Sequence, residues 1–138
     1  MTAGTARHQI VVCTTCRHLG SDCRPGLELI DKLRAGVRLA QQTGLVGDDF
    51  AVEGFACMAG CSRPCTVAYR ADGKCSYLFG DIDADADIDD LLAFAALYSD
   101  RQDGWSRSAE RPSGLSGKTL ARIPAALVVT RTTGAPAT

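Results

Sequence analysis

The sequence predicts an α/β fold with the element order β-α-β-β-β-α, in which a mixed four-stranded sheet has helices packed on it. Strand-like runs of β-branched and aromatic residues are separated by two segments in which apolar residues recur at helical spacing. An Asp-Gly pair, typical of hairpin turns, joins two of the strand-like runs. The 138 residues fit one domain with an extension.

The first half of the chain predicts two parallel strands joined by a crossover helix. The first strand is expected at His8 to Val12, a β-branched run ending at Cys13. A helix is expected over Leu27 to Gln42, because apolar residues recur there every three or four positions. Asp49 to Ala56 alternates loosely and predicts a second strand with a bulge at Gly54.

The second half predicts a hairpin followed by a helix. The hairpin strands are expected at Cys65 to Arg70 and at Lys74 to Phe79, with the turn at Ala71-Asp72-Gly73. Asp87 is expected to cap a helix that ends near Ser99. This organisation predicts a domain at residues 8–100 and a C-terminal extension at 101–138. The extension is expected to pack on the domain and to be disordered at its end, with these anchors: Trp105, Leu115 and Ile123.

Composition excludes several classes of function. The net charge of −1 provides no basic field for nucleic acid. The sequence contains no run of eighteen apolar residues, which is about the length that a membrane-spanning helix needs. Residues 1–8 lack the apolar stretch of a secretory signal. We therefore expect a cytoplasmic protein that binds neither nucleic acid nor a membrane.

Cysteine is the unusual feature, with seven residues in a chain of this length. Structural disulfides are rare in a reducing compartment, and an odd count fits a fully paired framework poorly. The first group follows the first predicted strand and the second follows the second strand: Cys13, Cys16 and Cys23, then Cys57, Cys61 and Cys65. Clustered cysteines of this kind indicate metal binding or redox chemistry.

The two groups are expected to meet in space. Open α/β sheets bind ligands at the carboxyl ends of their strands, and both groups follow such an end. Two thiolates from each group would give four soft ligands, a set that suits an iron–sulfur cluster or zinc. A nearby helix N-terminus would stabilise the negative charge.

Several stretches resemble the thioredoxin-like [2Fe–2S] ferredoxins and the small ferredoxin-like subunit of respiratory complex I. The resemblance covers about Ile10 to Tyr98 and is carried by four motifs: Val12-Cys13-Thr14-Thr15, Cys57-x-x-x-Cys61, Thr66-Val67-Ala68-Tyr69 and Asp72-Gly73. It implies a thioredoxin-like fold, a [2Fe–2S] cluster and electron transfer to a redox partner protein, and it leaves a homodimer open.

A closer resemblance covers nearly the whole chain. It rests on the following stretches: CTTCR (13–17), CSRPC (61–65), YLFGD (77–81), DGW (103–105), RP (111–112) and ARIP (121–124). These are similar to an uncharacterised, DUF1636-like family of predicted metal-binding proteins that occurs beside cobalamin-biosynthesis genes. This likeness implies a metal site and a link to cobalamin biosynthesis.

The resemblance implies cluster ligands at Cys13, Cys57 and Cys61. The fourth ligand is open between Cys16 and Cys23. Cys16 belongs to the motif of the closer family, and a two-residue spacer can chelate one iron, whereas Cys23 fits the ferredoxin spacing. We favour Cys16.

The cysteines and histidines also allow interpretations other than an iron–sulfur cluster. Cys65 is expected to be a buried small residue that packs under the cluster, and Cys75 a plain core or surface residue. His8 and His18 are expected to be solvated. The same four thiolates suit structural zinc, or a zinc or cobalt metallochaperone without electron transfer. Cys13-x-x-Cys16 could instead be a redox dithiol pair.

Neither a catalytic constellation nor a calcium loop is visible in the sequence, so no enzymatic activity is expected. Five alternating aspartates from Asp81 to Asp89 lack the glycine and glutamate of a calcium loop. They predict a solvated helix start that could also dock a basic redox partner.

Overall fold

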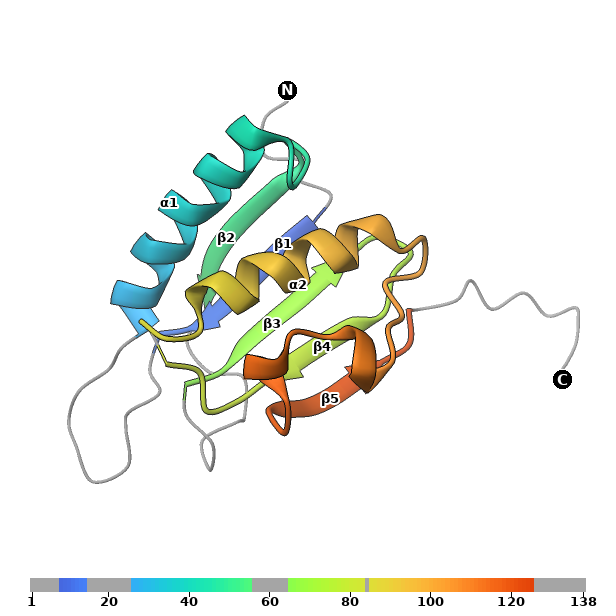
Figure 1. Ribbon diagram of the computed structural model, residues 1–138. Coiled ribbons are helices and arrows are strands. Elements are labelled where there is room, and N and C mark those ends of the chain that lie inside the picture. The colour runs from blue at the N-terminus through green and yellow to red at the C-terminus, as the bar shows by residue number, and fades with distance from the viewer. Residues whose placement is uncertain (1–7, 15–25, 56–64, 84, 126–138) are drawn as a thin grey trace, which may run out of the picture.

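The computed structural model describes residues 8–14, 26–55, 65–83 and 85–125 (Figure 1). The elements follow one another in this order: β1 (His8–Cys13), α1 (Gly26–Thr43), β2 (Phe50–Phe55), β3 (Val67–Ala71), β4 (Ser76–Phe79), α2 (Ile88–Asp100), two 3-10 turns (Ser108–Glu110 and Ser113–Leu115) and β5 (Thr119–Ile123). The predicted α/β order through α2 is confirmed, and every predicted helix and strand is present.

The sheet is mixed, as predicted, but it has five strands in the order β2-β1-β3-β4-β5. β1 and β2 run parallel, and the other neighbours are antiparallel. The expectation of four strands is wrong because β5, within the predicted extension, pairs with the outer edge of β4. The predicted bulge at Gly54 is also wrong, since the pairing of β1 with β2 is regular from His8↔Phe50 to Cys13↔Phe55.

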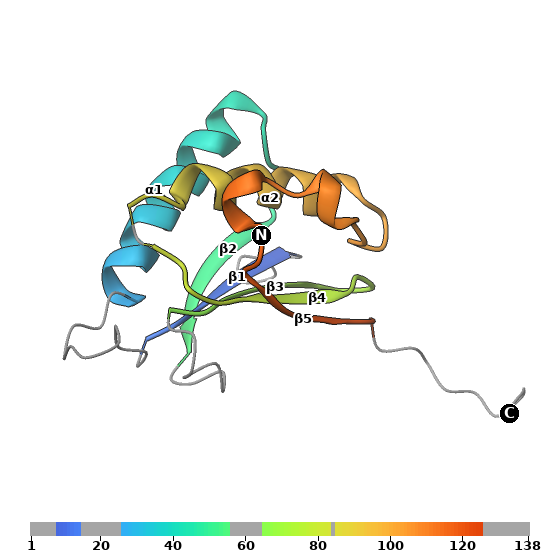
Figure 2. The same cartoon turned by 60° about the horizontal axis from the view of Figure 1, so that its bottom comes forward.

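Both helices and both 3-10 turns lie on one face of the sheet (Figure 2). α1 packs against β1 and β2 and also touches α2, which lies over the β3 and β4 side. On the opposite face, no helix of the described residues covers the strands. The buried apolar side chains of β1, β2, β3 and β4 contribute to the core between the sheet and the helices.

The core between α2 and the sheet is aromatic. Tyr69, Tyr77 and Phe79 from the strands meet Phe94 and Tyr98 from α2, mostly edge to face, with ring centroids 4.7–6.1 Å apart. Such pairs add to the stabilisation that apolar burial provides. Burial raises the pKa of Tyr69, whose neutral hydroxyl donates to the Leu91 carbonyl at 2.6 Å.

The start of α2 differs from the prediction in one detail. Asp87 occupies the N-cap position but makes no side-chain capping bond. Its Oδ2 accepts instead the Asp83 backbone N–H at 2.8 Å and the Lys118 ammonium at 2.6 Å. Asp87 therefore ties the loop before α2 to the chain just before β5.

Of the three anchors expected in the extension, one is buried. Leu115 is 1% exposed and packs in the core, whereas Trp105 is 40% exposed and Ile123 is 59% exposed. The extension is attached chiefly by β5 and by polar contacts, because its strand pairs with β4 along Ser76–Phe79. The predicted disorder at residues 132–138 lies outside the described residues.

Candidate metal centre at the ends of β1 and β2

Cys13 lies at the carboxyl end of β1 and is fully buried. On one side it is paired with Phe55, the last residue of β2. On the other side its backbone N–H donates to the Thr66 carbonyl at 3.1 Å. Phe55 immediately precedes residues 56–64 and Cys65 immediately follows them. Both ends of the segment that carries Cys57 and Cys61 therefore lie beside Cys13.

The segment that carries Cys16 and Cys23 also begins and ends at Cys13. Thr14 leads into it, and its backbone N–H and its hydroxyl both donate to the Phe55 carbonyl, at 2.9 and 3.3 Å. Gly26, the first residue of α1, follows it. A Cβ atom on Gly26 would lie 2.2 Å from the Cys13 carbonyl oxygen, so only glycine allows this approach. Four chain ends thus converge on one strand end.

The helix α1 is held tightly against this point. A Cβ atom on Gly54 would lie 2.8 Å from Cγ2 of Thr14 and 2.9 Å from Cδ1 of Ile30. The missing side chain at Gly54 lets α1 and the end of β1 approach β2 closely. The N-terminus of α1, where helix N–H groups carry partial positive charge, is consequently fixed beside the Cys13 backbone.

Of the predicted ligands, only Cys13 is among the described residues. Cys16, Cys23, Cys57 and Cys61 lie outside them, as does His18, so the ligand set stays a prediction. Within residues 8–14, 26–55, 65–83 and 85–125, no group of three histidine, cysteine or acidic side chains could hold a metal ion. The described residues on either side of the two cysteine segments lie together. Metal binding at this point would depend on the cysteines within the segments.

The expectation that Cys65 is buried is confirmed, and of the two positions left open for Cys75, core or surface, the structure shows the core. Cys65 is fully buried in the hydrophobic core, and its carbonyl accepts the Ile82 N–H at 3.1 Å. Cys75 is 2% exposed, and burial raises the pKa of its thiol. A thiol with a raised pKa stays protonated, and a protonated thiol is neither a good nucleophile nor a good metal ligand.

The acidic loop that precedes α2 lies close to Cys65, at the Cys13 end of the molecule. It contains Ile82, which is hydrogen-bonded to Cys65, and it connects to α1 through an ion pair between Asp85 and Lys32. Lys32 also contacts Glu28 at 2.8 Å, and the hydrogen bonds that its ammonium donates, first to Asp85 and then to Glu28, raise the Lys32 pKa. These side chains are exposed, so the pairs add little to stability.

Sequence reasoning missed a polar cluster at the opposite end of β1. His8 is 4% exposed, and the expectation that it is solvated is wrong. Its Nδ1 lies 3.0 Å from the Asp49 carboxylate, and its Nε2 lies 2.9 Å from the ammonium of buried Lys74. The ammonium also donates to the Tyr98 and Ser99 carbonyls at the end of α2, at 2.8 and 3.1 Å.

The geometry of this cluster fixes the tautomer of His8. An ammonium can only donate, so Nε2 must accept and Nδ1–H donates to Asp49. No local motif could have revealed the cluster, because its members are 41 and 66 positions apart in the chain. Its polar groups satisfy one another, and it serves to hold the start of β1 to the end of α2.

Comparison with known proteins places the chain in a family. A family profile described as "Protein of unknown function (DUF1636)" matches residues 10–125. The chain belongs to this family. The resemblance to this family that the sequence motifs predicted is therefore confirmed. None of the curated proteins compared with it matches.

Solved structures with a similar fold are thioredoxin-like. One is a thioredoxin-like [2Fe–2S] ferredoxin from Aquifex aeolicus, with 14% identity, a TM-score of 0.54, and coverage of 83% of this chain and 91% of that chain. A cysteine-to-serine variant of the thioredoxin-like [2Fe–2S] ferredoxin from the same organism gives 13% identity, a TM-score of 0.53, and coverage of 83% and 98%. The predicted thioredoxin-like fold is confirmed. Within the part of the DUF1636 protein that the structure describes, neither helix combines the length and the apolar character that crossing a membrane requires.

Proposed function

We propose that the DUF1636 protein binds a [2Fe–2S] cluster and carries single electrons between partner proteins. The ligands are Cys13, Cys57, Cys61 and either Cys16 or Cys23. One observation carries the proposal: both ends of both cysteine segments lie against Cys13, at the carboxyl ends of two parallel strands. The thioredoxin-like fold, shared with [2Fe–2S] ferredoxins, supports it.

Chain length lets the other cysteines reach this point. An extended chain advances about 3.3–3.6 Å per residue at most. Cys16 is two residues beyond Thr14, Cys57 is two residues beyond Phe55, and Cys23 is three residues before Gly26. Each is therefore within about 7–11 Å of chain from a residue that contacts Cys13. Cys61, four residues before Cys65, is within about 14 Å.

The described residues would contribute three things to such a centre. Cys13 would provide one sulfur ligand from a strand end that is fully buried. The N-terminus of α1 would offset part of the negative charge of four thiolates. Thr14 ties the end of β1 to Phe55 at the end of β2. A bound cluster would supply reversible one-electron exchange, and burial and hydrogen bonds to sulfur would set its reduction potential.

Anaerobic purification followed by metal and sulfide analysis tests the proposal. We expect iron and acid-labile sulfide in equal amounts, a red-brown colour that dithionite bleaches reversibly, and an EPR signal from the reduced form. Zinc or cobalt without sulfide would contradict the proposal and support the metallochaperone alternative. The link to cobalamin biosynthesis stays an implication of the family resemblance.

Serine variants identify the fourth ligand. If Cys16 is the ligand, Cys16→Ser loses most of its iron and Cys23→Ser keeps it, and the reverse holds if Cys23 is the ligand. Cys75→Ala is the matched control, because its thiol is buried in the core and its loss should leave the iron content unchanged. Retention of iron in both serine variants would contradict ligation by either residue.

A further inference from the structure

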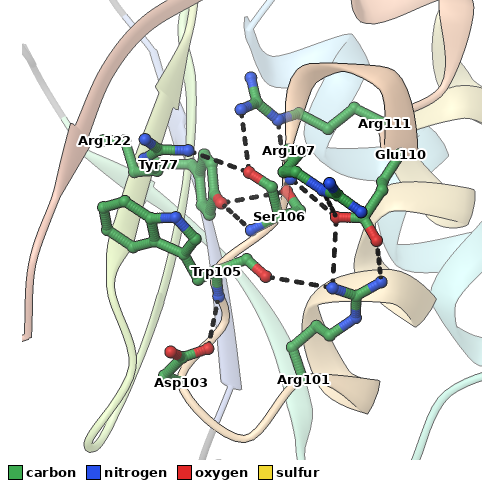
Figure 3. A network of polar contacts seen from close by, with 9 residues as sticks. All are labelled: Tyr77, Arg101, Asp103, Trp105, Ser106, Arg107, Glu110, Arg111 and Arg122. Carbon is green, nitrogen blue, oxygen red and sulfur yellow. Dashed lines mark hydrogen bonds and ion pairs between the residues drawn. The ribbon is translucent and has the colours of Figure 1, made fainter.

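Arginines from the chain that follows α2 and from β5 gather around one residue, Ser106. Figure 3 shows Arg111 and Arg122 reaching Ser106 from two sides, with Arg101 and Arg107 close by. Ser106 itself is fixed, because its backbone N–H donates to the Tyr77 hydroxyl at 2.9 Å and its own hydroxyl lies 3.0 Å from the same oxygen. This group of side chains is the arginine cluster: Arg101, Arg107, Arg111 and Arg122.

The carboxylates near Arg111 and Arg122 are engaged by other partners. Glu110 binds Arg101 at 2.5 Å and accepts the Arg107 backbone N–H at 2.8 Å. The hydrogen bond from Arg101 is the main reason that the Glu110 pKa falls to about 2, so Glu110 is ionised and committed to Arg101. Asp103 accepts the Trp105 backbone N–H at 2.9 Å. Lys118 nearby is paired with Asp87.

Arg111 and Arg122 donate only to neutral oxygen atoms among the described residues. Arg111 donates to the Ser106 carbonyl at 3.1 Å, to the Ser106 hydroxyl at 3.2 Å and to the Thr119 hydroxyl at 2.8 Å. Arg122 donates to the same Ser106 carbonyl at 2.9 Å. Neither guanidinium forms an ion pair with any carboxylate in residues 8–14, 26–55, 65–83 or 85–125. Each has five N–H groups, so N–H groups remain available on both.

The two guanidinium groups are close neighbours. They share one carbonyl oxygen, so their donating nitrogen atoms can be no further apart than the two hydrogen bonds laid end to end. Two like charges at that separation repel each other, and more strongly where they are partly shielded from water. An anion that contacted both would remove the repulsion and add charge-assisted hydrogen bonds.

A cavity opens beside Arg111. It has a volume of about 290 Å³ and is lined by Arg111, Leu115, Ser116, Gly117 and Thr119. This volume is below the roughly 300–1,000 Å³ of pockets for drug-sized ligands, so a single oxyanion group fits better than a nucleotide. The side chains of Ser116 and Thr119 add hydroxyl groups, which can donate to an anion.

We propose that Arg111 and Arg122 bind an oxyanion, a phosphate or a carboxylate group, with help from the Ser116 and Thr119 hydroxyls. The site is independent of the proposed cluster. Arg122 is already oriented, because its Cζ lies 3.6 Å from the centre of the Trp105 indole ring while Nη1 holds Ser106. Arg111 is oriented by Thr119, by Ser106 and by the face of Tyr77 at 5.4 Å. Donors that are held in place lose little entropy when an anion binds.

Tryptophan fluorescence tests the proposal directly, because Trp105 is the only tryptophan in the chain and is stacked on Arg122. The purified full-length protein is titrated with inorganic phosphate, with acetate and with chloride at constant ionic strength. We expect a saturable change with phosphate or acetate and none with chloride, and the better binder of the two identifies the group. Equal responses to all three salts, or no saturable response, would overturn the proposal.

Variants separate binding from structure. Arg111→Gln and Arg122→Gln should each weaken anion binding at least tenfold, whereas Arg107→Gln, whose side chain is 85% exposed, should not. If a glutamine variant does not fold by circular dichroism, NMR of the arginine Nε–H groups of the wild-type protein replaces it. Phosphate or acetate should then shift the Arg111 and Arg122 signals and leave that of Arg38 unmoved. Unchanged Arg111 and Arg122 signals would contradict the proposal.

Discussion

The two ends of β1 bury reactive groups in different ways. At His8, hydrogen bonds join the imidazole to the Lys74 ammonium and to the Asp49 carboxylate. Two carbonyl oxygens of α2 accept the other hydrogen bonds of the ammonium. At Cys13, a buried thiol stands where four chain ends converge and where two cysteine-bearing segments begin and end. At the first end, described residues hydrogen-bond one another, whereas at the second end the proposed site needs cysteines from the two segments.

This difference separates a structural cluster from a candidate functional one. Buried polar groups that satisfy one another, as at His8, stabilise a fold and leave no need for a ligand. Several cysteines in segments that begin and end at the same strand ends would give a soft ligand set if their sulfur atoms met there. The comparison therefore assigns stability to the His8 end, and the Cys13 end is the place of the proposed metal site.

Gly26→Ala should have the largest effect on stability, at the Cys13 end. The new Cβ would lie 2.2 Å from a backbone carbonyl oxygen, so α1 or the end of β1 must move. Overpacking of this kind costs about 1–3 kcal/mol, or more where backbone must shift. Urea unfolding measures it, and the variant should also bind less iron.

Gly36→Ala in the same helix is the control for this substitution. Its Cβ would meet the end of the flexible Leu92 side chain at 2.7 Å, and alanine is the better helix former. We expect a change within about 1 kcal/mol of the wild type. Equal stability losses in the two variants would show that the approach of Gly26 to Cys13 has no special importance.

Lys74→Met should break the His8 end. Methionine keeps most of the apolar stem but leaves His8 Nε2 and the Tyr98 and Ser99 carbonyls without their donor. Unsatisfied buried acceptors cost about 1–3 kcal/mol, which urea unfolding would measure. Lys32→Met, at an exposed ion pair, should cost less than about 1 kcal/mol. A Lys74→Met variant as stable as the wild type would mean that the cluster does not hold α2 to β1.

The smallest expected effect is the pH dependence of stability that comes from Glu110. This residue provides an ion pair, with Arg101, to set beside the buried groups at the two ends of β1. Its pKa is lowered from the ordinary 4.5 to about 2, first by Arg101 and then by the Arg107 backbone N–H. Its stabilising contribution is therefore present above the unfolded-state pKa and is lost as the pH falls toward 2. Carbon-13 NMR should show this low midpoint and a higher one in Arg101→Gln. A midpoint near 4.5 in the wild type would contradict the pairing.

Local patterns predicted most of the fold and failed where contacts are distant. The periodicity of α1 and the β-branched run of β1 are local, and both elements were found within a few residues. β5 was missed because TLARI has no clear alternation, and it becomes a strand only by pairing with β4 some forty residues earlier. His8 was misjudged for the same reason, since Phe50, Asp49 and Lys74 bury it from distant positions.

The candidate site was predictable in part. The position of Cys13 at a strand end, and the parallel pairing that brings Phe55 beside it, followed from the order of elements. The close approach of Gly26 did not, because nothing local shows that the first residue of α1 faces the carbonyl of Cys13 in β1. The arginine cluster also escaped notice, since it depends on a loop that folds back to β5.

The iron and sulfide content of Cys13→Ser, with the EPR spectrum of its reduced form, tests the central claim most directly. Cys13 is the described cysteine on which both segments converge. We expect lost iron, or a changed EPR spectrum from a serine-ligated cluster, while Cys65→Ala keeps the iron and the spectrum of the wild type. A Cys13→Ser protein with wild-type iron, sulfide and EPR spectrum would contradict the account.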